Sequence, residues 1–218
     1  MSEDLKKLEL IANENLKLAA DEKDHVKLLN NVIINEIKRA KARKEFAQKE
    51  LKLNGIREEL VETYTKLIEK KMDLVEKEFI NMNNKEIEVE LDFSKYTELI
   101  SKIQIEIAEI QYKIAELEVE IADQKTLIAY ERNYVANERM DMANKILAYI
   151  KAKKKGKSEK KILNLQEEYL AIQETITANR KDIYKDLKKL KGIENNLIDL
   201  KKELSIKLAE REKIRPKI

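Results

Sequence analysis

The most regular repeat in the chain lies in residues 99–150, which read LISKIQIEIAEIQYKIAELEVEIADQKTLIAYERNYVANERMDMANKILAYI. One large apolar side chain recurs every seven residues, and an alanine follows each of them. The apolar residues are Ile107, Ile114, Ile121, Ile128, Val135 and Met142, and the alanines are Ala108, Ala115, Ala122, Ala129, Ala136 and Ala143. Because an α-helix has 3.6 residues per turn, a seven-residue spacing returns to nearly the same side. The stretch therefore predicts one long helix with two adjacent stripes.

The alanine stripe indicates that this helix is packed on more than one side. Small side chains let a second helix approach closely, so we expect the six alanines to contact another copy of the chain or another protein. Further along, the heptad d positions become polar at Gln124, Glu131 and Glu138. A single two-stranded coiled coil does not drift in this way, and the pattern therefore favours a bundle with changing neighbours.

The composition limits the fold class. The chain has 218 residues, of which 40% are charged and 43% hydrophobic, with three glycines, one proline and no cysteine. So few glycines and prolines leave little room for turns, and the apolar periodicity argues against disorder. We expect an all-α protein, either an elongated antiparallel coiled coil or a long helical bundle.

Charge and hydropathy exclude several classes of protein. The formal net charge is +3, and the charges are interspersed, as on solvated helix faces. Without cysteine there is no disulfide and no thiolate metal site. No run of about 18 apolar residues is present, and the first residues lack the order of a signal peptide. We expect a protein of the cytoplasm or of a virion interior that is neither secreted nor transmembrane.

The chain divides into three segments by pattern. Residues 1–82 predict a long helix, which either breaks at Asn54-Gly55 or runs through it, because Asn and Gly both favour a helix end. Residues 83–93 predict a turn and a short acidic strand. Residues 94–218 predict a long antiparallel helical hairpin, starting at an N-cap provided by Ser94, with a basic connector at 151–161.

Residues 86–93 give the one non-helical signal. Apolar and acidic residues alternate strictly, which is typical of a half-buried strand. The apolar set is Ile87, Val89, Leu91 and Phe93, and the acidic set is Glu86, Glu88, Glu90 and Asp92. A solitary strand cannot satisfy its own backbone, so we expect it to pair with another chain. The carboxylates are interpreted as the solvated face of an edge strand rather than a cation site.

The connector at 151–161 is strongly basic. It contains Gly156 and the lysines Lys151, Lys153, Lys154, Lys155, Lys157, Lys160 and Lys161. Two interpretations stay open: a solvated loop, or a contact with a polyanion such as phosphate, nucleic acid or an anionic membrane. No arginine or aromatic residue lies between the lysines to read or stack a base.

No residue pattern points to catalysis, a cofactor or a metal. Glu22 and His25 have the Glu-x-x-His spacing of di-iron bundles, but such sites need two of these motifs and the chain has one histidine. We therefore expect an exposed histidine. Asn179 falls at a heptad d position, where a polar residue sets the register of the packed helices. The chain has no P-loop, nucleophile elbow, dinucleotide fingerprint or zinc motif, so we expect neither an enzyme nor a small-molecule substrate.

These observations favour a structural role. We expect a coiled-coil protein that acts as an oligomeric scaffold or as a bracing subunit of a larger complex, for example a virion component, a cytoskeletal element or a stalk. Its partners are then copies of itself, other proteins, or both. Two alternatives remain: a helical dimer or filament that binds and curves a membrane surface, and a protein that packages nucleic acid.

Overall fold

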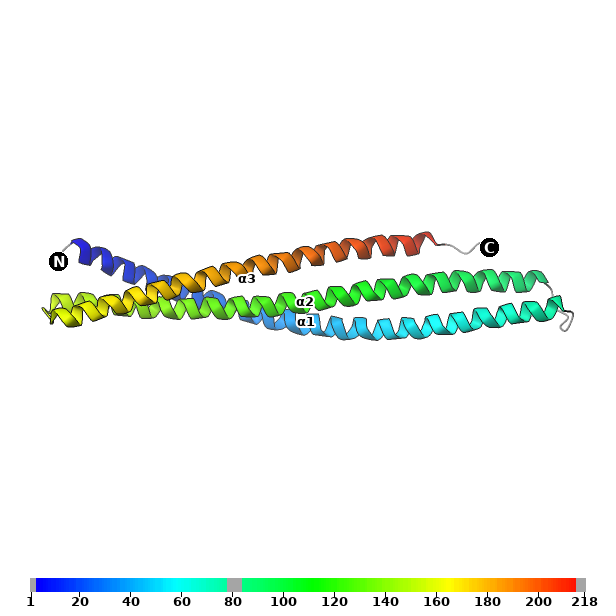
Figure 1. The fold of residues 1–218 in the computed structure, drawn as a ribbon, viewed down its shortest axis with the longest axis horizontal. Coiled ribbons are helices and arrows are strands. Elements are labelled where there is room, and N and C mark those ends of the chain that lie inside the picture. Colours follow the sequence, from blue (N-terminus) through cyan, green and yellow to red (C-terminus); the bar gives the residue numbers. More distant parts are fainter. Residues whose placement is uncertain (1–2, 78–83, 215–218) are drawn as a thin grey trace. The chain divides into compact units, whose positions relative to one another are not determined.

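The computed structural model describes residues 3–77 and 84–214, and within them three long helices pack against each other. Helix α1 spans Glu3–Glu76, α2 spans Asn84–Lys154 and α3 spans Glu159–Lys213 (Figure 1). The described residues contain no strand. The prediction of an all-α helical bundle is therefore confirmed.

The predicted strand at 86–93 is wrong, because these residues form the first turns of α2. Their burial follows a helical period: Ile87 and Ser94 are buried, Leu91 is half-buried, and Val89 and Phe93 are exposed. Strict alternation over eight residues also fits a helix in which only every third or fourth residue faces a neighbour. A helix satisfies its own backbone hydrogen bonds, so the segment needs no second chain to pair with. Ser94 accordingly lies inside α2 and does not cap it.

Helix α1 runs without a break through Asn54-Gly55. The Asn54 side chain donates a hydrogen bond to the backbone carbonyl of Gln104 on α2, at 3.4 Å. This contact holds the segment against its neighbour, and a glycine inside a helix costs only about 1 kcal/mol relative to alanine. Residues 78–83, which include the end of the predicted first helix and the first residue of the predicted turn, lie outside the described residues.

Gly156 ends α2. Its φ of 59° is a left-handed conformation that favours glycine. The Gly156 N–H donates to the carbonyl of Lys153 at 3.2 Å, and the Lys157 N–H donates to the carbonyl of Ala152 at 3.1 Å. These two bonds form a Schellman motif, which satisfies the last carbonyls of the helix. Ser158 then precedes α3, and its carbonyl accepts a hydrogen bond from the N–H of Ile162.

The chain forms two compact units, and each takes segments from all three helices. The first consists of Met1–Ile37 with Glu120–Ile193, and the second of Lys38–Val119 with Glu194–Ile218. In the first unit Ala12 clusters with Met142, Ala143 and Ile146, while Val26 and Ile33 cluster with Ala129. In the second unit the buried residues include Ile68, Ile87 and Ile107.

Helix α2 is the common partner in both units. Wherever an ion pair joins two helices in the described part of the chain, one of its residues belongs to α2. In the first unit these pairs are Glu9–Lys154, Glu22–Arg132, Glu36–Lys125 and Lys145–Glu168, and in the second they are Arg43–Glu118, Lys44–Glu116, Lys71–Glu90, Lys201–Glu118 and Lys207–Glu106. Residue numbers rise on one helix as they fall on the other, so α1 and α3 both run antiparallel to α2.

Candidate interaction surfaces

The six alanines of the sequence repeat lie between α1 and α2. Each is at most 3% exposed, and the same seven-residue spacing continues in both directions along α2. We call the whole row the small-residue seam; it consists of Ile87, Ser94, Ser101, Ala108, Ala115, Ala122, Ala129, Ala136, Ala143 and Ile150. Buried residues of α1 with the same spacing face it, namely Ala12, Ala19, Val26, Ile33, Ala40, Ala47 and Ile68. The chain's own α1 therefore covers the surface that the sequence analysis assigned to a partner.

A polar pair lies inside the small-residue seam in the second unit. The hydroxyl oxygens of Thr65 on α1 and Ser94 on α2 are 2.6 Å apart and buried. The Thr65 hydroxyl donates to the carbonyl of Val61 at 3.0 Å, so Ser94 donates to Thr65. This pair fixes which residues of α1 and α2 lie side by side. The sequence analysis missed it, although Ser94 and Ser101 follow the alanine spacing.

The seam between α2 and α3 is built from larger side chains. Every third or fourth residue of α3 faces inward, and Ile176, Leu190 and Ile193 are buried. In the first unit the rings of Tyr149 and Tyr169 meet edge to face, with their centroids 5.7 Å apart. Such contacts add about 0.5–1.5 kcal/mol beyond the apolar area that they bury.

Polar residues interrupt this second seam in the first unit. Gln124 Nε2, Glu131 Oε2 and Asn179 Nδ2 are buried without a hydrogen-bond partner among the described residues. Burial raises the pKa of Glu131, and the negative charge and hydrogen bond of Asp186 raise it further. Asn179 thus lies in the helix contact where the sequence analysis put it. The unpaired atoms make this part of the seam less stable than an apolar one.

The predicted interface residues at the start of α2 separate into two groups. Ile87 belongs to the small-residue seam and Leu91 is half-buried. Val89 and Phe93 are 67% and 57% exposed, and the Phe93 ring lies 6.3 Å from that of Tyr96. Only these two of the four remain on the surface of the chain.

All seven lysines of the basic connector are exposed. Lys154 Nζ lies 3.6 Å from a carboxylate oxygen of Glu9, and Lys153 Nζ lies 5.0 Å from the centre of the Tyr149 ring. The other five are Lys151, Lys155, Lys157, Lys160 and Lys161. The connector is therefore a concentrated positive patch beside the α2–α3 turn.

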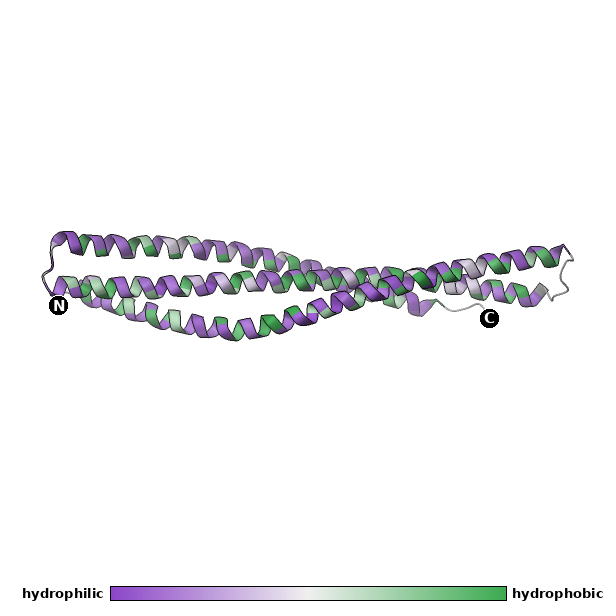
Figure 2. Cartoon of the chain, turned by 90° about the horizontal axis from the view of Figure 1, so that it is seen from below, coloured by the Kyte–Doolittle hydropathy of each residue, from purple (hydrophilic) through white to green (hydrophobic). Residues whose placement is uncertain are grey.

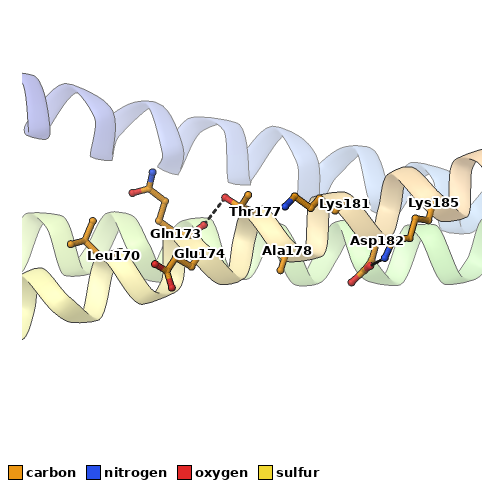
Figure 3. A pocket seen from close by; sticks show the side chains of 8 residues that line it. All are labelled: Leu170, Gln173, Glu174, Thr177, Ala178, Lys181, Asp182 and Lys185. Atoms are coloured by element: carbon orange, nitrogen blue, oxygen red, sulfur yellow. Dashed lines mark hydrogen bonds and ion pairs between the residues drawn. The ribbon is translucent and has the colours of Figure 1, made fainter.

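The Glu22 and His25 side chains of the Glu-x-x-His pattern belong to α1. His25 is exposed, and Glu22 pairs with Arg132 at 3.8 Å. No group of three or more candidate metal-ligating side chains occurs within residues 3–77 and 84–214. A shallow depression on α3 is lined by that helix alone (Figure 3). Within it, Lys185 donates to Asp182 at 2.8 Å, and the Thr177 hydroxyl donates to the Gln173 carbonyl at 2.9 Å.

An apolar groove lies between the three helices of the second unit. Phe46 of α1, Ile114 of α2 and Leu204 of α3 line it. Arg43 crosses its edge with two bonds of 2.9 Å to the Glu118 carboxylate. The groove thus lies between α1 and α3, which contact adjacent rows of α2.

None of the described helices has a segment both long and apolar enough to cross a lipid bilayer. Comparison of the chain with protein-family models, with curated proteins and with solved structures finds no match.

Proposed function

We propose that the protein is a structural coiled-coil protein that assembles into oligomers and acts as a scaffold or bracing subunit of a larger assembly. A virion component, a cytoskeletal element and a stalk are the kinds of assembly that fit this role. The chain would contribute rigid helices and surfaces for contact, and it would carry out no reaction of its own.

One observation carries the proposal: a heptad stripe of large apolar residues on α1 that the chain leaves uncovered. Its members are Ile11, Leu18, Val32, Phe46, Leu53, Leu60, Leu67 and Leu74, which are between 41% and 68% exposed, and His25 and Arg39 interrupt the row. Each immediately precedes a residue that faces α2, so the stripe lies beside the small-residue seam. Scattered apolar residues are normal on a protein surface, but a row in register with a coiled-coil seam is typical of a helix contact.

Light scattering after size-exclusion chromatography, over at least a hundredfold range of concentration, tests the proposal. A discrete oligomer of the 25.6 kDa chain is the expected result. The mass of a single chain at every concentration would overturn self-assembly as the basis of its function.

The lysine patch at 151–161 supports a second candidate function, attachment of the helices to an anionic membrane surface. All seven lysines are exposed within eleven residues of chain, and each lysine near an anionic surface adds about 1 kcal/mol. Binding to vesicles with and without anionic lipid, at low and high salt, tests it. Replacement of Lys151, Lys155, Lys157 and Lys160 by glutamine abolishes binding if this candidate is correct, and unchanged binding excludes it.

A further inference from the structure

The end of the α1–α2 pair in the second unit has no third helix beside it. Lys207 pairs with Glu106 at 2.8 Å, and α3 ends six residues later, at Lys213. In Figure 1, α1 and α2 continue past this point. We call residues 56–76 of α1 and 84–100 of α2 the tip. Along most of the tip, no described residue of α3 lies beside α1 and α2.

One face of the tip carries large apolar residues on both helices and is crossed by the Lys71–Glu90 ion pair, and we call it the tip face. On α1, Leu60, Leu67 and Leu74 each precede a seam position, and on α2, Phe93 and Ile100 precede Ser94 and Ser101. Both helices are right-handed and run antiparallel, so the residues just before the seam point to the same side of the pair. The groove lined by Phe46, Ile114 and Leu204 occupies this same side further along. Figure 2 shows apolar residues recurring along both helices of the tip.

The tip face continues the contact that α3 makes elsewhere on α2. Phe93 and Ile100 belong to the same seven-residue row as Ile107 and Ile114, where α3 lies. Ile107 is 6% exposed, whereas Phe93 is 57% exposed. The apolar row therefore extends beyond the helix that covers it. Val89, one turn before Phe93, enlarges the uncovered area.

Charges on the two edges of the tip face are opposite in sign at the same level. Lys66 and Lys70 lie on the edge of α1 away from α2, because the buried Ile68 marks the side that faces α2. Asp92 lies on the edge of α2 away from α1 by the same argument from Ser94. The Thr65–Ser94 hydrogen bond puts Lys66 and Asp92 at one level. Both side chains are exposed, and Lys66 Nζ also lies 4.0 Å from a carboxylate oxygen of Glu62 on its own helix.

From this arrangement we infer that the tip face binds the tip face of a second copy of this chain. A two-fold axis parallel to the helices keeps each residue at its level and exchanges α1 with α2. Lys66 of one chain then meets Asp92 of the other, twice over, and the apolar rows of both tips become buried in a four-helix bundle. The tip face is thus complementary to itself, because its apolar rows meet apolar rows and its opposite charges meet each other. This inference rests on the proposed function and names the contact that builds the oligomer.

The first test changes the apolar centre of the face in the full chain. Leu60→Glu with Leu67→Glu weakens the dimer by more than about thirtyfold, because two desolvated contacts occur twice across the axis. The matched control is Leu10→Glu with Leu28→Glu, which alters two leucines of α1 that are 61% and 69% exposed and lie outside the tip. The control stays dimeric. Sedimentation equilibrium gives the dissociation constants, and far-ultraviolet circular dichroism shows whether each variant keeps its helices.

The second test uses the charges. Lys66→Glu, and separately Asp92→Lys, each place like charges opposite one another in a homodimer and weaken it. An equimolar mixture of the two variants restores pairing as a heterodimer. Both variants leave the Lys71–Glu90 pair intact. If the mixture associates no better than its components, the proposed pairing is wrong.

Orientation is tested by disulfide trapping, which is clean because the chain has no cysteine. A mixture of Lys66→Cys chains with Asp92→Cys chains gives a mixed disulfide under mild oxidation, and neither variant cross-links efficiently alone. Self-cross-linking of the Lys66→Cys chain as the main product would overturn the two-fold arrangement.

The outcomes separate this inference from the proposed function. An oligomer that survives Leu60→Glu with Leu67→Glu overturns the tip contact but leaves the scaffold proposal standing. A wild-type chain that stays monomeric at every concentration overturns both.

Discussion

Helix α2 contacts both α1 and α3. The two rows of residues that form these contacts belong to one seven-residue repeat, but their side chains differ in size and polarity. The contact with α1 uses alanine and serine, whereas the contact with α3 uses isoleucine and tyrosine with polar interruptions. Small side chains at every seventh position bring two helix backbones close and leave few atoms that could be rearranged. The α3 contact tolerates Gln124, Glu131 and Asn179 with unpaired polar atoms. The small-residue seam therefore tolerates fewer substitutions than the α3 contact, and the α3 contact contributes less to the stability of the fold.

The largest expected effect follows from crowding the small-residue seam. Ala129 is fully buried against Val26 and Ile33, so Ala129→Leu forces the helices apart and lowers the free energy of unfolding by about 2 kcal/mol. Urea unfolding followed by circular dichroism measures the change.

The control for that prediction is Ala178→Leu on the exposed side of α3, which leaves stability within about 0.5 kcal/mol of the wild type. Equal effects of the two substitutions would mean that α1 and α2 are not closely packed at Ala129.

A second expected effect concerns the polar part of the α3 contact. The pKa of Glu131 is raised by burial and by Asp186. In the folded chain this carboxyl therefore keeps a proton that the unfolded chain releases, so its contribution to stability is full below pH 4.5 and declines as the pH rises through the folded value. Glu131→Gln removes this decline, so the variant has a higher free energy of unfolding than the wild type at pH 7. Urea unfolding at several pH values checks both statements, and an unchanged pH profile would contradict them.

The turn that brings α3 back onto α2 depends on Gly156. An alanine at its φ of 59° costs about 1 kcal/mol, since the left-handed region disfavours a Cβ atom. Gly156→Ala is expected to lower the thermal midpoint, whereas Gly156→Asn lowers it less because asparagine tolerates this conformation. Identical midpoints for the two variants would argue against the Schellman turn.

The smallest expected effects on stability concern one glycine in each of the two helices that flank α2. Gly55 in α1 and Gly192 in α3 have no atoms within 4 Å of where a Cβ would lie. Alanine at either position stabilises its helix by about 0.5–1 kcal/mol. Differential scanning calorimetry detects both gains. A loss at Gly55 would show that α1 bends there.

The sequence predicted most of the fold because the evidence for helices is local and repeated. The seven-residue rows around Ile107 and Ala108, and the heptad of α3, are readable without tertiary information. The strand at 86–93 failed because alternation over eight residues fits both a strand and a helix, and only the contact with α1 decides between them. The partner of the alanine row also depended on tertiary structure, since a row of small residues does not reveal which helix covers it. The Thr65–Ser94 bond and the Glu131–Asp186 contact join residues far apart in sequence and carry no local signal.

The central claim is that α1 and α2 of the same chain close the small-residue seam in the register set by Thr65 and Ser94. Their hydroxyl oxygens are 2.6 Å apart, so cysteines at the two positions are suitably placed for a disulfide in a chain that has no other cysteine. We expect the variant Thr65→Cys with Ser94→Cys to oxidise within one chain, giving a cross-linked product that keeps the mass of a single chain in denaturing, non-reducing conditions. A product with the mass of two chains, or free thiols after mild oxidation, would contradict the account.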